Sequence, residues 1–348
     1  MNDRTGGAPY FRLFAHFARA GGSALYERLT LAIAEDPDML ALAAKVREGQ
    51  PQANILFAAV HALLLSGVND PLKEYYPSCG GRRAANDRDV YAAFRAFVAR
   101  HRGPLESILA SRVTNTNEVG RSALIYPALD LTARESGAPL QIIEIGPSAG
   151  LNLNWHSYGY RYTDELGEIV LARGGADLVL RSRLVGMGRP ALSADLPPVA
   201  SAFGLELNPV NLASETERLW LRALVWPERL DRLAQLEAAL AIAAAHPPPI
   251  VQGDAVLDLG NELDRFPLGA PVTLVDTLVT YQFDERAQRR FEASLLEASQ
   301  ARPIYRISAE SHGPSCFLDL FLYQGTSREA RRLAECDPHG GWLKWLEG

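Results

Sequence analysis

The sequence predicts an α/β protein in which a doubly wound, mostly parallel sheet follows an N-terminal helical domain. Two observations predict this class. Apolar residues recur at helical spacing through residues 1–136, and short β-branched runs alternate with helical patterns through residues 137–348. Strands that alternate with helices are typical of parallel sheets with helices on their faces.

The composition is that of an ordinary globular protein and excludes several classes. The chain has 348 residues, of which 47% are hydrophobic, and a net charge of −6. An acidic chain lacks the positive surface of a general nucleic-acid or membrane binder, so we expect a small-molecule substrate. The three scattered cysteines form no C-x-x-C pair, which predicts no metal site and no disulfide framework. A polar N-terminus without an apolar segment predicts a cytoplasmic protein.

Six helices are expected in the N-terminal domain. Gly21 and Gly22 separate the first two, and Ser23 stands where it can cap the second. Pro104 fits the first turn of another helix, and Pro127 is expected to kink the last one. The apolar stripes lie near residues 11–18, 25–33, 55–64, 91–98, after 104, and over 117–134.

The sheet is expected to begin with Leu140–Ile145, a β-branched run between turn residues. Residues 203–209 are the second expected strand and its end, and residues 250–251, 271–279, 303–307 and 316–323 are the later ones. Residues 158–198 fit neither pattern. Their alternating tyrosines predict a hairpin inserted into the sheet domain.

The most informative segment is Glu144-Ile145-Gly146-Pro147-Ser148-Ala149-Gly150-Leu151-Asn152, a strand that ends in an acid, a turn of small residues and an expected helix. Glycines let a chain turn tightly and let a ligand approach the backbone. The same letters also match the G-x-S-x-G elbow of α/β-hydrolases, with Ser148 as nucleophile. A G-x-G-x-x-G dinucleotide turn fits worst.

The turn resembles the acid-x-Gly-x-Gly-x-Gly turn of class I S-adenosylmethionine (SAM) dependent methyltransferases, with Ser148 at the middle glycine. This resemblance implies a Rossmann-like fold, SAM as cofactor and S-adenosylhomocysteine as product. It implies cofactor contacts along the turn and at the next strand ends. Those residues are Glu144, Gly146, Pro147, Ser148, Gly150, Asn152, Glu206, Asn208, Asp254, Ala255 and Thr277.

Two of these assignments need comment. Glu206 would bind the ribose hydroxyls, with Asp195 as the competing candidate, although such an acid usually follows the turn by about 20 residues. The insertion at 158–198 accounts for the longer spacing. Asp254 would face the adenine, and a helix-capping role is its structural alternative.

A polar cluster precedes the last helix of the N-terminal domain and contains Asn115, Glu118 and Arg121. With the turn at 144–152, the strand end at 204–209 and the C-terminal His339–Trp345 motif, it resembles a bacterial family of unknown function. Functionally these three side chains would line an acceptor pocket. Structurally, Thr116 or Asn117 would cap the helix and Glu118 would lie favourably in its first turn.

The sequence therefore predicts SAM-dependent methyl transfer to an unidentified small molecule. Asp276 and Glu118 are the candidate general bases, with Arg121 and Asn115 beside them. Two alternatives stay open. One is a serine hydrolase that uses Ser148 with Asp276 and His312, and the other is a non-catalytic, nucleotide-binding relative of the methyltransferases.

Overall fold

The computed structural model describes residues 6–115, 117–174, 177–312 and 315–347. The chain divides into two compact units. The first comprises Met1–Thr116 with Asn211–Ala234, and the second comprises Asn117–Val210 with Gln235–Gly348. The sequence analysis placed the only boundary at residue 136. The structure instead gives the helix that ends there to the second unit, and returns the chain to the first unit at residue 211.

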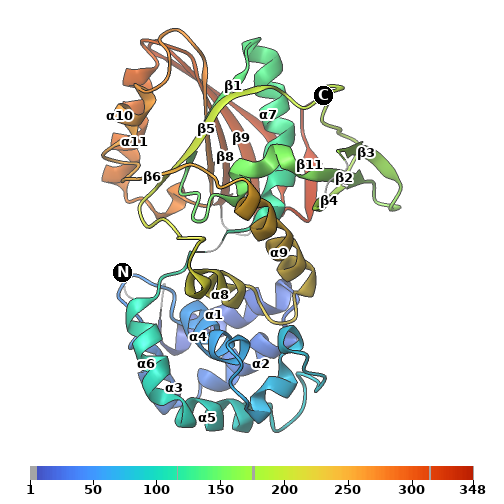
Figure 1. Cartoon of the computed structure of the whole chain (residues 1–348), viewed down its shortest axis with the longest axis vertical. Helices are drawn as coiled ribbons and strands as arrows, with labels where there is room; N and C mark the ends of the chain where they lie inside the picture. The colour runs from blue at the N-terminus through green and yellow to red at the C-terminus, as the bar shows by residue number, and fades with distance from the viewer. Residues whose placement is uncertain (1–5, 116, 175–176, 313–314, 348) are drawn as a thin grey trace. The chain divides into compact units, whose positions relative to one another are not determined.

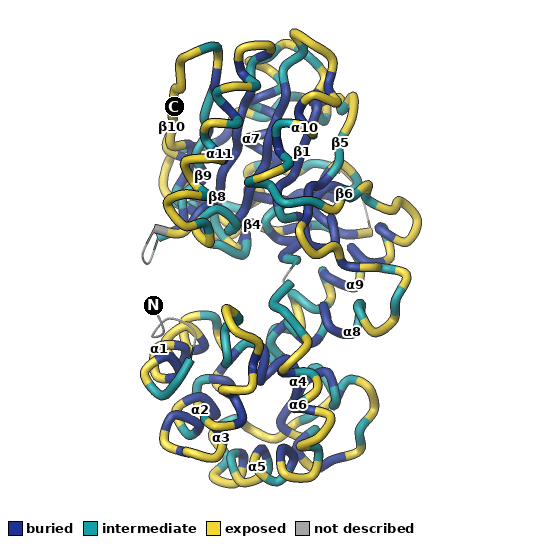
Figure 2. Tube along the Cα trace, turned by 90° about the vertical axis from the view of Figure 1, so that its left-hand side faces the viewer, coloured by how far each residue is buried: buried dark blue, intermediate teal, exposed yellow. Residues whose placement is uncertain are grey.

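The first unit is helical, as the sequence predicts, and is built around one buried helix. This helix, α4 (Gln52–Leu65), is apolar on every side and is mostly buried by its neighbours, as the burial colours show (Figure 2). The predicted cap at Ser23 is confirmed, since its hydroxyl accepts a hydrogen bond of 3.1 Å from the amide of Tyr26. The helices are α1 (Gly7–Ala20), α2 (Ala24–Ile33), α3 (Pro37–Ala43), α4 (Gln52–Leu65), α5 (Val90–Arg100), α6 (Arg102–Ser111) and α8 (Glu215–Leu224).

A histidine at the centre of α4 joins segments that are distant in the chain. His61 Nδ1 lies 3.0 Å from the carbonyl oxygen of Ala223 in α8, and Nε2 lies 2.7 Å from Ser78 Oγ. Complete burial lowers the pKa of His61 to about 4. The neutral ring therefore satisfies both partners, with one nitrogen donating and the other accepting.

The second unit contains an 11-stranded, mostly parallel sheet, as predicted. Its strands are β1 (Leu140–Ile145), β2 (Gly159–Thr163), β3 (Ile169–Arg173), β4 (Val179–Leu184), β5 (Val199–Glu206), β6 (Ile250–Gln252), β7 (Val272–Thr277), β8 (Ile304–His312), β9 (Ser315–Gln324), β10 (Ser327–Cys336) and β11 (Trp342–Trp345). Its helices are α7 (Ser122–Ser136), α10 (Leu259–Leu263) and α11 (Glu285–Ala298), and α9 (Leu230–Ala245) has residues in both units.

Five neighbouring strands form the parallel part of this sheet, in the order β6-β5-β1-β7-β8. From β1 the chain moves outward through β5 and β6, then returns to the other side of β1 for β7 and β8. The winding direction therefore reverses between β1 and β7. Beyond β8, strands β9, β10 and β11 continue as an antiparallel meander. The predicted insertion contains the antiparallel hairpin β2–β3, as expected, together with β4.

Helices cover both faces of the parallel strands (Figure 1). Ile143 and Ile145 belong to a core cluster with α10 and α11. Because side chains alternate along a strand, Ile142 and Glu144 face the opposite side, where they lie beside Ile125 of α7. The chain after the turn forms a helix from Leu151, as expected, and it is a 3₁₀ helix, Leu151–Ser157.

Candidate functional site

The carboxyl ends of β1 and β7 mark the point where the sheet reverses its winding direction. In open α/β sheets, ligands bind in the crevice at this position. We call the surrounding residues the switch-point site. It comprises the turn 146–152, Glu206 at the end of β5, residues 277–281 after β7, the segment 118–121 and the loop 337–341, all in the second unit.

Backbone strain is concentrated at this position. Among the described residues, the two non-glycine residues with positive φ are Ser148, at 57°, and Leu278, at 55°. They follow β1 and β7 respectively, one on each side of the reversal. A left-handed conformation costs roughly 1–2 kcal/mol for residues with a Cβ, and such strain clusters at functional sites.

The turn 146–152 and the residues 277–281 after β7 are in contact with each other. A Cβ on Gly146, whose φ is 63°, would lie 2.8 Å from Val279 Cγ2. A Cβ on Gly150, at φ 73°, would lie 2.9 Å from the ring of Pro248. Both glycines are therefore required by space as well as by conformation.

The amide groups of the turn are bound by the protein itself. The amide of Ser148 donates to Glu206 Oε2 at 2.7 Å, and that of Leu151 donates to Asn117 Oδ1 at 3.0 Å. The amide of Gly150 donates to Pro147 O at 2.8 Å. These contacts hold the turn in one conformation. A phosphate-binding loop differs, because it needs backbone amides that are free to bind the ligand.

Glu206 links two of the loops at this edge of the sheet. Its side chain is buried, and besides Ser148 it binds the amide of Asn208 at 2.9 Å through Oε1. Asn208 itself is exposed. A carboxylate has about four acceptor positions, so these two bonds leave acceptor capacity for a ligand hydroxyl. The ribose-binding role of Glu206 stays a prediction.

Glu144 lies inside the unit, on the face of the sheet that α7 covers. Burial raises its pKa to about 8, against the opposing effects of a hydrogen bond from Asn152 and the charge of Arg121. Asn152 Oδ1 in turn accepts a bond of 2.8 Å from Ser122 Oγ. The carboxyl group of Glu144 is therefore mostly protonated at neutral pH, and it lines a small cavity with Trp155.

The predicted polar cluster meets the C-terminal motif. Arg121 Nε donates to Pro338 O at 2.9 Å, and Nη1 donates to Thr277 O at 3.1 Å. Glu118 Oε2 lies 3.2 Å from His339 Nδ1. Arg121 thus ties the loop 337–341 to the end of β7. The sequence marks His339 only as the first residue of the C-terminal motif and does not predict its pairing with Glu118.

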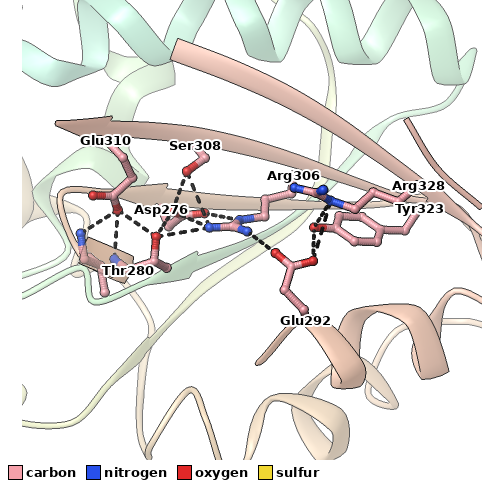
Figure 3. Close-up of polar contacts among 9 residues, drawn as sticks. Asp276, Thr280, Glu292, Arg306, Ser308, Glu310, Tyr323 and Arg328 are labelled. Atoms are coloured by element: carbon pink, nitrogen blue, oxygen red, sulfur yellow. Dashed lines mark hydrogen bonds and ion pairs between the residues drawn. The ribbon is translucent and has the colours of Figure 1, made fainter. Parts of the chain in front are cut away.

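Asp276 has a different environment from that of a general base. It is fully buried, and Arg306 binds both of its oxygens, at 2.7 and 3.1 Å, while Ser308 Oγ donates at 2.8 Å (Figure 3). The network continues through Arg306 to Glu292 at 2.8 Å. A carboxylate with these partners holds strands together, and the geometry argues against the catalytic role predicted for it.

Glu310, at the end of β8, is a second acid that the sequence analysis missed. Its Oε1 accepts bonds from the amides of Val279 and Thr280, at 2.9 and 2.8 Å (Figure 3). Burial and the charge of Asp276 raise its pKa. Its Oε2 is buried and has no hydrogen-bond partner among the described residues. No motif in the sequence signals this residue.

The remaining predicted residues have ordinary environments. Asp254 Oδ1 accepts a bond of 2.7 Å from the amide of Val256 within a turn. It does not cap a helix, because α10 begins at Leu259 and its N-cap is Asp258. Ala255 packs against the core of the second unit. Asn115 belongs to the first unit, and its role stays a prediction. The described residues contain no group of three acids, histidines or cysteines that could hold a metal ion, and no helix among them could cross a membrane.

Comparison with known proteins identifies a family. A family model described as an uncharacterized protein conserved in bacteria (DUF2332) matches residues 8–345. No curated protein and no solved structure matches the chain.

Proposed function

The chain belongs to this family of uncharacterized bacterial proteins, and from the geometry of its switch-point site we propose that it binds SAM and transfers the methyl group to a small molecule. The observation that carries the proposal is the paired strain at Ser148 and Leu278, on the two sides of the reversal. Strain of this kind persists only where the surrounding structure holds it, and a ligand site is a common reason.

Strand order supports a nucleotide-type ligand. Counted along the chain, the five parallel strands lie in the order third, second, first, fourth, fifth. This is the order of the doubly wound folds that bind nucleotides at the reversal point. Two departures limit the likeness. The turn leads into a 3₁₀ helix, and the strands after β8 form a meander.

The charges of the site also suit SAM. Glu118, Glu206 and Glu310 are buried acids at this edge, and Arg121 is the nearby cation. SAM carries two positive groups, a sulfonium and an ammonium, and one carboxylate. A site with more acids than bases favours such a ligand over a phosphate-bearing one. This agrees with the turn amides of Ser148, Gly150 and Leu151, which are bound to other groups of the protein.

Titration of SAM and of S-adenosylhomocysteine into the full chain, followed by calorimetry, tests the proposal. Tyr281 is 62% exposed and stands just after β7, where its ring can stack on the adenine. Since stacking on a base is worth about 1–3 kcal/mol, Tyr281→Ala should weaken SAM binding about tenfold or more. Phe17→Ala, at an aromatic residue 59% exposed in the first unit, is the matched control. A folded wild-type protein that binds neither compound would refute the proposal.

The hydrolase alternative rests on one observation, the positive φ of Ser148, which a nucleophile elbow also has. The burial of Ser148 opposes it. The residue is 4% exposed, whereas an elbow presents its hydroxyl to the substrate. We therefore rank methyl transfer first.

A further inference from the structure

Glu118 lies near the start of the second unit's sequence and His339 near its end, and their pairing brings these two segments together. Their backbones are in direct contact. A Cβ on Gly120 would lie 2.3 Å from His339 O, and a Cβ on Gly340 would lie 2.0 Å from Gly120 O. No side chain fits at either position, so the two glycines fix how Glu118 and His339 face each other.

Further contacts fix the loop that carries His339. Asp337 Oδ2 accepts a bond of 2.8 Å from the amide of Gly341, which closes the loop. Arg121 binds Pro338 O on one side and Thr277 O on the other. Because Thr277 ends β7, the loop is anchored to one of the two strands that flank the winding reversal.

The two side chains differ in exposure. The side chain of Glu118 is 5% exposed, and that of His339 is 36% exposed. His339 Nδ1 is itself buried and lies 3.2 Å from Glu118 Oε2, within the range of an ion pair but without the alignment of a hydrogen bond. The exposed part of the ring is therefore not Nδ1, and among the described residues no hydrogen bond occupies Nε2.

Apart from the alignment of the hydrogen bond, the placement is that of a general base oriented by a carboxylate. A carboxylate beside one ring nitrogen holds the imidazole in position and stabilises the imidazolium that forms, while the other nitrogen takes the proton. We propose that His339 is the general base of the switch-point site, that Glu118 is its positioning residue, and that the methyl acceptor is a small molecule with a hydroxyl group. This inference rests on the proposed function.

The step balances as follows. His339 Nε2 takes the hydroxyl proton, and an oxygen electron pair forms the new bond to the methyl carbon. The bond between that carbon and the sulfonium breaks, and its electron pair stays on sulfur, which leaves neutral S-adenosylhomocysteine. One positive charge thus moves from sulfur to the imidazole, where the Glu118 carboxylate stabilises it. A hydroxyl acceptor needs such a base, whereas a thiolate acceptor does not.

Carbethoxylation with diethyl pyrocarbonate, followed by mass spectrometry of each histidine peptide, tests the pair without a known acceptor. The reagent modifies a free, unprotonated ring nitrogen, and the exposed His16 serves as internal reference. We expect His339 to react in the wild type and to react several-fold faster in Glu118→Gln, because the charge that stabilises the imidazolium is gone, with the rate of His16 unchanged. Glu335→Gln, which removes a charge on β10 from the surface pair with Lys344, outside the loop 337–341, is the control and should leave the rate of His339 unchanged. Circular dichroism verifies that each variant is folded.

Two outcomes would overturn the inference. One is a wild-type His339 that does not react, and the other is a rate that Glu118→Gln leaves unchanged. Calorimetry with His339→Gln separates this inference from the proposed function. SAM should bind this variant within about twofold of the wild type, because the base contacts the acceptor. If SAM fails to bind the wild type while the rate of His339 still depends on Glu118, the methyl donor is wrong and the paired base stands.

Discussion

Glu144 offers the sharpest test of the electrostatics of the second unit. Its pKa is about 8 in the folded protein, because burial disfavours the charged form, and its ordinary value is 4.5. The folded state therefore keeps a proton that the unfolded chain releases. The stability that depends on a protonated Glu144 is fully present below about pH 4.5 and is lost as the pH rises through 8.

The magnitude follows from the two pKa values. Each pH unit between them costs 1.36 kcal/mol, so the loss from pH 5 to pH 8 is about 4 kcal/mol. Glu144→Gln has nearly the same shape, can still bind Asn152 and does not titrate. We expect its free energy of unfolding to be close to that of the wild type at pH 5 and about 4 kcal/mol higher at pH 8.

Urea denaturation between pH 5 and pH 8, followed by circular dichroism, measures the difference between the two proteins. Hydrogen exchange of a peptide that covers β1 assigns the effect to the second unit. The exposed Glu168 supplies the control, since Glu168→Gln should change stability equally at both pH values. If the difference between Glu144→Gln and the wild type does not vary with pH, the buried, protonated state of Glu144 is wrong.

Three further predictions concern single residues. His61, whose burial lowers its pKa to about 4, should stay neutral in ¹⁵N NMR spectra down to pH 5. Because the unfolded chain gains the proton near pH 6.5, the free energy of unfolding of the first unit should fall by about 3 kcal/mol from pH 6.5 to pH 4. A protonated His61 at pH 6 would contradict this. Asp276→Asn should lower the free energy of unfolding by about 3–5 kcal/mol in urea, because it leaves the buried Arg306 with Glu292, which is partly exposed, as its charge partner. Asp319→Asn, in the surface pair with Arg332, should cost less than about 1 kcal/mol, and equal losses would show that the Asp276 pair is not a buried one. A fluorophosphonate probe should leave the wild type unlabelled, and labelling that disappears in Ser148→Ala would establish the hydrolase instead.

The periodicity of apolar residues predicted the helices of the first unit and the parallel strands of the second. The turn at 146–150 was visible as well, since small residues after a β-branched run have few other uses. The domain boundary differed because α7 has apolar spacing like the helices before it. Spacing along a helix does not show which core the helix packs against.

The candidate site could be predicted only in part, because it depends on contacts between distant segments. Glu118 and Arg121 stood out as a polar cluster before a helix, but each has a partner more than 200 residues later, in the loop 337–341. Asp276 was a reasonable base by its position at a strand end. Its ion pair with Arg306 of β8 follows from strand pairing, which a single sequence does not reveal.

The order in which the chain is synthesised has a consequence for the first unit. Its core needs α8, and the carbonyl group of Ala223 that binds His61 lies 162 residues further along the chain. Residues 117–210 belong to the second unit and are made first. At about 5–20 residues per second, these 94 residues (210 − 117 + 1) take roughly 5–20 s on the ribosome. During this interval the apolar surface of α4 that packs against Trp220 and Ala223 is not yet covered, so we expect the nascent first unit to bind chaperones until residues 211–234 have been made.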